Sequence, residues 1–262
     1  MKLPAERAIK VRGLVWRVIE TRGAKDGPTL LMLPGTLGTA SIFKDALRSL
    51  GTRVHMVSVT YPMIEDIHRL ADSLAALMDR LGIPRASIVG SSLGGFLAQH
   101  FAARHAQRVQ QLILGNTLCD PGLTRRLVGR QPVERLRATP ASAHRAIVLA
   151  SVKSWPETDP ATKKLKAVLI DSGTRLLSAR AMKARVLAVQ AAPAVPPLSV
   201  PADHITILDT EDDPLLPREV QDSVLRRYPG AHHVRLSSGG HYPYIVRATD
   251  YTAVLERALG IA

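Results

Sequence analysis

Apolar residues recur along the first half of the chain in two alternating patterns. Short continuous apolar runs are separated by longer stretches whose apolar positions have helical spacing. The runs predict strands at 29–33, 54–59, 86–89 and 111–114. The stretches between and after them predict helices at 41–50, 64–81 and 93–105. Strands that alternate with helices indicate βαβ units. The pattern therefore predicts an α/β fold, a mostly parallel sheet flanked by helices.

This alternation stops in the middle of the chain and then resumes. The sequence from about residue 119 is rich in Arg, Ala and Leu and mostly helical in pattern, and a Pro-rich connector follows at 191–201. Further strands are predicted at 204–208 and 233–236, and further helices at 218–228 and 244–259. We therefore predict a core in two parts, residues 1–118 and 198–262, with residues 119–197 inserted as a helical cap.

The composition is that of an ordinary globular protein, with 46% hydrophobic and 22% charged residues in 262. No apolar stretch approaches the roughly 18 residues of a membrane span, and Met1–Gly13 lacks the apolar segment of a signal peptide. The single cysteine, Cys119, excludes an intramolecular disulfide. We expect a cytoplasmic protein without stable membrane insertion.

The formal net charge of +13 is concentrated in the expected cap, which has 14 Lys and Arg residues and 5 Asp and Glu residues. Aromatic residues are only 4% and do not alternate with basic ones, as they do where proteins stack on bases, so no nucleic-acid partner is predicted. The basic side chains either lie at a pocket mouth, where they would favour anionic substrates, or form solvated helix faces.

A candidate nucleophile lies between a predicted strand and the helix that follows it. The segment 89–95 reads VGSSLGG and contains the pattern G-x-S-x-G, with Ser92 at the serine position. Gly90 and Gly94 flank the serine because the sharp turn leaves no room for larger side chains. The N–H groups at the start of the helix favour negative charge on the serine. The alternative is a serine that only caps this helix.

His241 is the candidate general base. It follows a predicted strand in the loop SSGGHYP (237–243), late in the chain, as the order Ser, acid, His requires. The alternative is an ordinary loop histidine. The pair His232-His233 lacks a third ligand at metal-site spacing, so no metal is predicted.

The acid that would orient His241 lies in a loop rich in carboxylates. Asp213 is the leading candidate, in the segment ILDTEDDPLLP (207–217), just after a predicted strand. The alternatives are Asp120, which follows an earlier strand, and the neighbours Asp212 and Glu211. An aspartate at this position is also typical of a turn or helix cap.

Stabilisation of an oxyanion requires two backbone N–H groups that point to one position. One is expected from Leu93, which follows the serine. The other is expected from Thr36 or Leu37, with Thr36 slightly favoured, in the glycine-containing loop LPGTLGT (33–39). The glycine spacings match neither G-x-x-x-x-G-K-[ST] nor G-x-G-x-x-G, and no cofactor is predicted.

These motifs resemble the α/β-hydrolase family, and within it the maspardin-like hydrolases. The similar stretches are 33–43 (LPGTLGTASIF), 59–62 (VTYP), 90–102 (GSSLGGFLAQHFA), 112–120 (LILGNTLCD) and 237–250 (SSGGHYPYIVRATD). The resemblance implies the α/β-hydrolase fold. It covers both parts of the core and is weak in the cap. Where the family often has His-Gly in the oxyanion loop, this chain has Pro34-Gly35.

The residues and the resemblance together predict a serine hydrolase of the carboxylesterase type, acting on a small or medium ester through an acyl-enzyme. Dehalogenases and epoxide hydrolases of this fold have Asp where Ser92 stands, which argues against their chemistry. The alternative is a catalytically silent interaction protein like the maspardin branch, which lacks the triad histidine. The presence of His241 and Asp213 here favours an enzyme.

Overall fold

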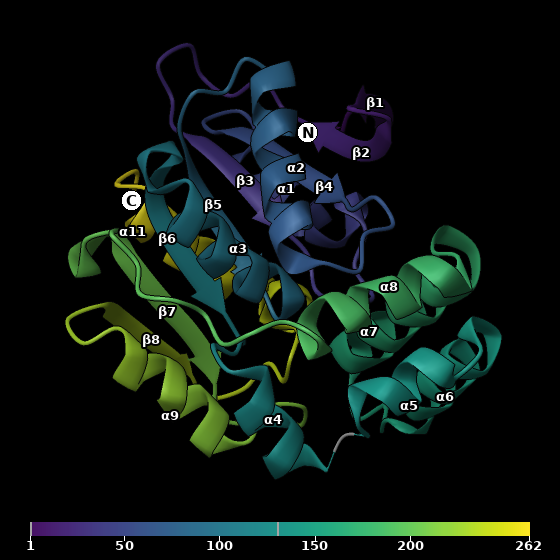
Figure 1. The fold of residues 1–262 in the computed structure, drawn as a ribbon. Helices are drawn as coiled ribbons and strands as arrows, with labels where there is room; N and C mark the ends of the chain where they lie inside the picture. Colours follow the sequence, from purple (N-terminus) through teal and green to yellow (C-terminus); the bar gives the residue numbers. More distant parts are fainter. Residues whose placement is uncertain (1, 130) are drawn as a thin grey trace.

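The computed structural model describes residues 2–129 and 131–262. Met1, in the expected core, and Arg130, in the expected cap, lie outside the described residues. The described chain forms an eight-stranded sheet in the order β1-β2-β4-β3-β5-β6-β7-β8 (Figure 1). The strands are β1 (Arg7–Val11), β2 (Leu14–Glu20), β3 (Thr29–Leu33), β4 (His55–Thr60), β5 (Ala86–Ser91), β6 (Val109–Gly115), β7 (Ile205–Thr210) and β8 (His232–Leu236). From β4 to β8 neighbouring strands are parallel, which confirms the predicted α/β fold.

The first two strands form an antiparallel hairpin that the apolar pattern did not predict. Both central residues of its turn, Arg12 and Gly13, have positive φ (47° and 80°), as tight hairpins favour. Most of the hairpin is buried on one face only, and polar residues interrupt its apolar residues, so it forms no long continuous apolar run. Ile19, near the end of β2, is the exception and is buried on the opposite face. Trp16 anchors it, since its side chain is fully buried and its indole N–H donates to Ser73 Oγ (2.9 Å).

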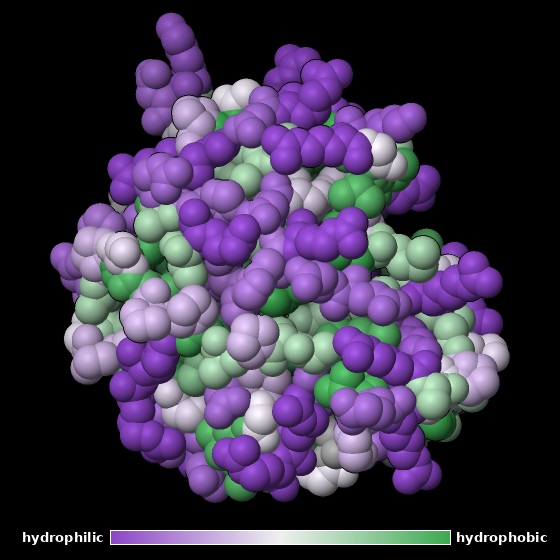
Figure 2. Space-filling view, in the orientation of Figure 1, coloured by the Kyte–Doolittle hydropathy of each residue, from purple (hydrophilic) through white to green (hydrophobic). Residues whose placement is uncertain are grey.

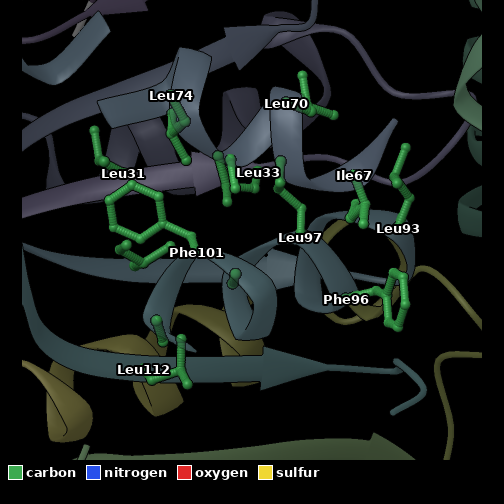
Figure 3. Close-up of a cluster of buried hydrophobic side chains, with 14 of the residues drawn as sticks. Leu31, Leu33, Ile67, Leu70, Leu74, Leu93, Phe96, Leu97, Phe101 and Leu112 are labelled. Atoms are coloured by element: carbon green, nitrogen blue, oxygen red, sulfur yellow. The ribbon is translucent and has the colours of Figure 1, made fainter. Parts of the chain in front are cut away.

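Helices cover both faces of the sheet, so its strands can be apolar throughout. Leu31 and Leu33 belong to the core cluster that includes α2 (Ile67–Arg80), α3 (Leu93–Arg104) and α9 (Arg218–Arg227) (Figure 3). Leu30 and Met32 point to the opposite cluster, which includes α1 (Lys44–Leu50), α10 (Pro243–Val246) and α11 (Ala248–Ala258). Figure 2 shows that hydrophilic residues separate the apolar patches on one outer face.

Two of the expected helices differ from the prediction at their ends. The helix expected at 64–81 begins only at Ile67, because the carboxylate of Asp66 accepts the N–H of Arg69 (2.8 Å) and caps it. The helix expected at 244–259 is divided into α10 and α11 at Arg247, whose φ of −122° is not helical.

The described residues between β6 and β7 form five α-helices and a π-helical turn at Ser172–Leu176. The α-helices are α4 (Pro121–Val128), α5 (Val133–Ala138), α6 (Ala141–Ser154), α7 (Pro160–Asp171) and α8 (Ala179–Gln190). Figure 1 shows α5 to α8 beyond the ends toward which the strand arrows point. After α8 the Pro-rich connector has no helix or strand until a short 3-10 turn at Ala202–His204. We keep 119–197 as the proposed cap. No helix in the described part of the chain is long and apolar enough to cross a membrane.

Candidate active site

Ser92 lies at the sharp turn between β5 and α3, with a backbone conformation (φ 55°, ψ −119°) that non-glycine residues rarely adopt. Such a conformation costs on the order of 1–3 kcal/mol and persists only where surrounding contacts enforce it. Here the N–H of Ser92 donates to Gly115 O (3.0 Å), and the hydroxyl of Thr117 donates to Ser92 O (2.7 Å). Both contacts come from the end of β6 and the residues just after it.

The two glycines of the motif lie where chain segments approach too closely for a side chain. A Cβ on Gly90 would lie 2.2 Å from Gly94 O, and a Cβ on Gly94 would lie 1.8 Å from Leu33 O. These are contacts with backbone atoms, which cannot move aside as a flexible side chain can. The close packing of β3, β5 and α3 therefore explains why glycine stands on both sides of Ser92.

His241 and Asp213 are directly hydrogen-bonded to each other, with 2.8 Å between His241 Nδ1 and Asp213 Oδ2. The Asp213 side chain is fully buried, and its other oxygen accepts the N–H groups of Leu215 (2.8 Å) and Leu216 (3.1 Å). With Nδ1 bound to the carboxylate, the other ring nitrogen, Nε2, is the one that can accept a proton from a nucleophile.

The surroundings of Asp213 favour its charged form. Burial alone would raise the pKa of this carboxyl group. The charge of His241, together with hydrogen bonds from His241, Asn116 and the N–H of Leu215, outweighs burial, so the pKa lies below its ordinary value of 3.8. The group is therefore a carboxylate at neutral pH and can stabilise a charged imidazole.

Sequence reasoning missed Asn116, which follows β6 and has a positive φ of 37°. Its Nδ2 donates to Asp213 Oδ2 (2.8 Å), to Thr210 Oγ1 (2.9 Å) and, at 3.3 Å, to Gly240 O. Thr210 Oγ1 also donates to Gly240 O (2.7 Å). Asn116 therefore joins the carboxylate to the residue before the histidine. The sequence did contain a signal for this residue, an asparagine directly after a central strand. Asn adopts positive φ more readily than most residues, so it suits a sharp turn at such a position.

The alternative acids have other contacts. Asp212 accepts the N–H groups of Gly239 (3.2 Å) and Gly240 (2.8 Å), so it shapes the histidine loop instead of touching the imidazole. Asp120 caps α4 by accepting the N–H of Gly122 (2.7 Å). Glu211 is exposed.

The predicted residues meet at one cavity of about 620 Å³ between the core and the inserted helices. Its wall includes all of the candidates except Asp213, which lies behind His241: Thr36, Leu37, Ser92, Leu93 and His241. The inserted helices contribute mainly apolar side chains: Leu136, Ile147, Val148, Val152, Trp155, Val186 and Val189. Among the described residues this wall contains no Lys, Arg, Asp or Glu.

Several basic side chains of the inserted helices bind groups away from the cavity wall. Lys164 pairs with Asp45 on α1 (2.8 Å), and Lys166 pairs with Glu157 (3.0 Å). The described wall therefore gives no support to the expectation that basic cap residues attract anionic substrates into the pocket.

The described residues contain no group of three or more His, Cys, Asp or Glu side chains that could hold a metal ion. Of the histidine pair singled out in the sequence, His233 Nε2 contacts Asp209 (3.1 Å), which also binds Arg235. The carboxylate is therefore engaged in a hydrogen-bonded pairing between β7 and β8.

The chain belongs to the alpha/beta hydrolase family, whose sequence profile matches residues 30–254. Curated relatives include maspardin from Homo sapiens, which is 27% identical over 245 residues, 92% of this chain and 78% of that protein. Another is the pimeloyl-[acyl-carrier protein] methyl ester esterase of Chromobacterium violaceum, which is 38% identical over 104 residues, 37% of this chain and 39% of that protein. The maspardin similarity expected from the sequence is confirmed.

Solved structures of the same fold include an enol-lactonase from Burkholderia xenovorans LB400. It has a TM-score of 0.78 at 20% identity and covers 97% of this chain and 100% of that chain. A thermophilic esterase from Thermogutta terrifontis has a TM-score of 0.74 at 19% identity, with 98% of each chain covered. These structures share the α/β-hydrolase fold, and family membership supports a hydrolase activity.

We predict that Asn116→Gly lowers the free energy of unfolding by about 1–3 kcal/mol, because the acceptors on Asp213 and Gly240 each lose one of their hydrogen-bond donors in a buried network. Glycine keeps the positive φ, so the loss reports on the amide side chain. Urea unfolding measures it. Asn116→Ala, which must also adopt the positive φ, should be less stable still. A glycine variant as stable as the wild type would contradict a supporting role for Asn116.

Proposed function

We propose that this protein is a serine hydrolase that cleaves small or medium carboxylic esters through an acyl-enzyme. The observation that carries the proposal is the cavity, because Ser92 on its strained turn and His241 line the same space. His241 is in turn bonded to the buried Asp213. Acyl transfer by this chemistry requires a nucleophile, a base that takes its proton and an acid that orients the base.

In the proposed reaction, His241 Nε2 takes the proton of Ser92 as Oγ attacks the ester carbonyl carbon. The imidazolium then gives this proton to the departing alcohol, which leaves an acyl group on Ser92. Water, deprotonated by His241, attacks the carbonyl carbon of the acyl-enzyme, and the imidazolium then returns the proton to Ser92 Oγ as the carboxylic acid leaves. Asp213, held as a carboxylate by its buried hydrogen bonds, stabilises the imidazolium in both steps.

The proposed oxyanion donors are the backbone N–H of Leu93 and that of Thr36 or Leu37. Leu93 begins α3 immediately after Ser92, and Thr36 and Leu37 line the same cavity. The loop approaches the serine closely, since a Cβ on Gly35 would lie 3.3 Å from Ser92 Cβ. Two N–H groups that converge on a developing oxyanion commonly provide the largest single contribution to catalysis of acyl transfer.

Ester hydrolysis is the preferred reaction because the described cavity wall is mainly apolar and contains no Lys, Arg, Asp or Glu that would bind a charged second substrate. The names of two relatives are consistent with it, since both are pimeloyl-[acyl-carrier protein] methyl ester esterases. The alternative, a silent interaction protein, is favoured by the similarity to maspardin over 92% of this chain. The hydrogen-bonded His241–Asp213 pair facing the serine's cavity favours the enzyme.

Ser92 should form a covalent adduct with a fluorophosphonate, and Ser92→Ala should abolish the labelling. Ser91→Ala is the matched control, because Ser91 is the adjacent residue and is buried at the end of β5. Intact-protein mass spectrometry measures both. Equal labelling of the wild type and Ser92→Ala would refute the assignment, and a folded wild type that is never labelled would favour the interaction protein.

Asp213→Asn should reduce kcat on the order of 10⁴-fold without unfolding the protein, because the amide no longer stabilises the imidazolium or selects its tautomer. Asp120→Asn is the matched control. Asp120 accepts a helix-capping N–H, and asparagine caps helices equally well. Steady-state kinetics on an activated ester, with thermal melts of both variants, test the ranking. A larger loss for Asp120→Asn would show that the acid is misassigned.

The described cavity wall contains no Lys, Arg, Asp or Glu, which predicts a preference for neutral acyl groups. Esters with a distal carboxylate or ammonium should have kcat/KM values roughly tenfold or more below that of a matched neutral ester, because each charge must be desolvated without a partner. Rates on matched ester series at low and high salt measure this preference. Faster hydrolysis of the carboxylate ester, with an advantage that shrinks in salt, would mean that basic cap residues reach the substrate.

A further inference from the structure

Arg185 on α8 is a buried cation in an unusual setting. Its side chain is among the largest that are fully buried, with 1% of the residue exposed, and no carboxylate pairs with it in the described structure. The guanidinium lies over the ring of Tyr61, 5.1 Å from its centroid. Two of its nitrogens, Nε and Nη2, have no hydrogen-bond partner in the described chain.

Burial of a charge without a counterion costs free energy. Other interactions of Arg185 must therefore offset this cost. Burial lowers the pKa of Arg185 to about 10, which still leaves the guanidinium charged at neutral pH. The aromatic contact offsets only part of the desolvation, because the ring attracts the cation without carrying a formal charge. The side-chain hydrogen bonds of Arg185 in the described chain both go to one backbone segment.

That segment is the proposed oxyanion loop, residues 34–38. Arg185 Nη1 donates to the carbonyl oxygens of Thr36 (3.1 Å) and Gly38 (2.6 Å). The hydroxyl of Ser172, another residue of the inserted segment, donates to Leu37 O. On the core side, Tyr61 Oη donates to Pro34 O (2.8 Å).

Holding these carbonyl groups fixes the directions of the N–H groups. A peptide unit is planar and trans, so its N–H points opposite to its C=O. The bond from Arg185 to Thr36 O therefore sets the direction of the Leu37 N–H. The turn bond from Gly38 N–H to Gly35 O (3.0 Å) sets that of Thr36 in the same way. Arg185 acts on this turn from outside, through the carbonyl groups of Thr36 and Gly38.

We propose that Arg185 is a positioning residue through which the inserted helices hold the oxyanion loop in its catalytic geometry. The catalytic consequence of this inference rests on the proposed function. The effect of Arg185 on the loop rests on the hydrogen bonds alone. Displacement of a catalytic group by about 1 Å costs on the order of 100-fold in rate, so loss of this anchor has a measurable effect. Arg185 does not line the cavity among the described residues, so it acts through the loop and not on substrate.

Lys183 provides a matched control on the same helix. Its Nζ also donates to two backbone carbonyl groups, those of Arg137 and Thr139 (both 2.7 Å). Both acceptors lie in the inserted segment and not in the oxyanion loop. Lys183→Met therefore removes a cation and two equivalent hydrogen bonds from α8 without releasing residues 34–38.

The first measurement compares a trifluoromethyl ketone with the matched methyl ketone as inhibitors. Ser92 Oγ adds to the activated carbonyl carbon, the serine proton passes to His241, and the carbonyl oxygen becomes an oxyanion. Arg185→Met should weaken binding of the trifluoromethyl ketone and lower kcat by roughly 10- to 100-fold. KM and binding of the methyl ketone should stay within about twofold, because neither requires the oxyanion.

Arg185→Lys, which keeps the charge and a donor, should recover part of the loss, and Lys183→Met should resemble the wild type. Equal losses for the two inhibitors, or equal effects of Arg185→Met and Lys183→Met, would overturn the inference.

The second measurement is amide hydrogen exchange of peptides that cover residues 33–43, and it does not depend on activity. Arg185→Met should speed exchange there by at least about fivefold relative to Lys183→Met, because a released loop opens more often. Unchanged exchange would overturn the inference even in an active enzyme. If the wild type neither hydrolyses esters nor binds the trifluoromethyl ketone, the proposed function fails, and the exchange result alone decides whether Arg185 anchors the loop.

Discussion

The close contact between β3, β5 and the start of α3 is the constraint on which the site depends. Gly94 lies so near Leu33 O that no side chain fits, and this packing leaves the chain a single sharp path from strand to helix. Ser92 occupies the apex with positive φ, and the resulting strain is offset by the buried sheet on either side. The same contact brings the loop after β3 beside the serine. One packing contact therefore positions both the proposed nucleophile and the proposed oxyanion donors.

A second buried arrangement carries the histidine. Asp213 follows β7, Asn116 follows β6, and their hydrogen bond joins the ends of two neighbouring strands below the imidazole. The side chains of Thr210 and Asn116 both bind Gly240 O, and Asp212 binds the N–H of the same residue. The loop that carries His241 is therefore fixed from several directions. This glycine-rich loop owes its rigidity, which the proposed general base His241 requires, to its neighbours and not to its own sequence.

The sequence predicts the parts of this molecule that depend on local pattern. Continuous apolar runs identified the central strands because those strands are buried on both faces, whereas the hairpin of β1 and β2 was missed because most of it is buried on one face only. The motif around Ser92 was recognisable because neighbouring backbone atoms leave no room for a side chain at its glycines, which fixes their spacing in the sequence. Asn116 and Arg185 were missed, since their partners lie 97 and up to 149 residues away and no spacing rule connects them.

The inserted helices have two proposed physical roles, one that favours apolar side chains and one that requires a charged side chain. As the wall of the cavity they present Val, Leu and Ile side chains and no formal charge among the described residues. As the proposed support for the loop after β3 they place a charged guanidinium in the interior, where its burial costs solvation free energy and two of its nitrogens have no partner in the described chain. A merely structural contact between core and insertion would be more stable with apolar side chains. The presence of a cation at this position argues that the backbone carbonyl groups of the loop, and not the packing of helices, determine which residue stands there.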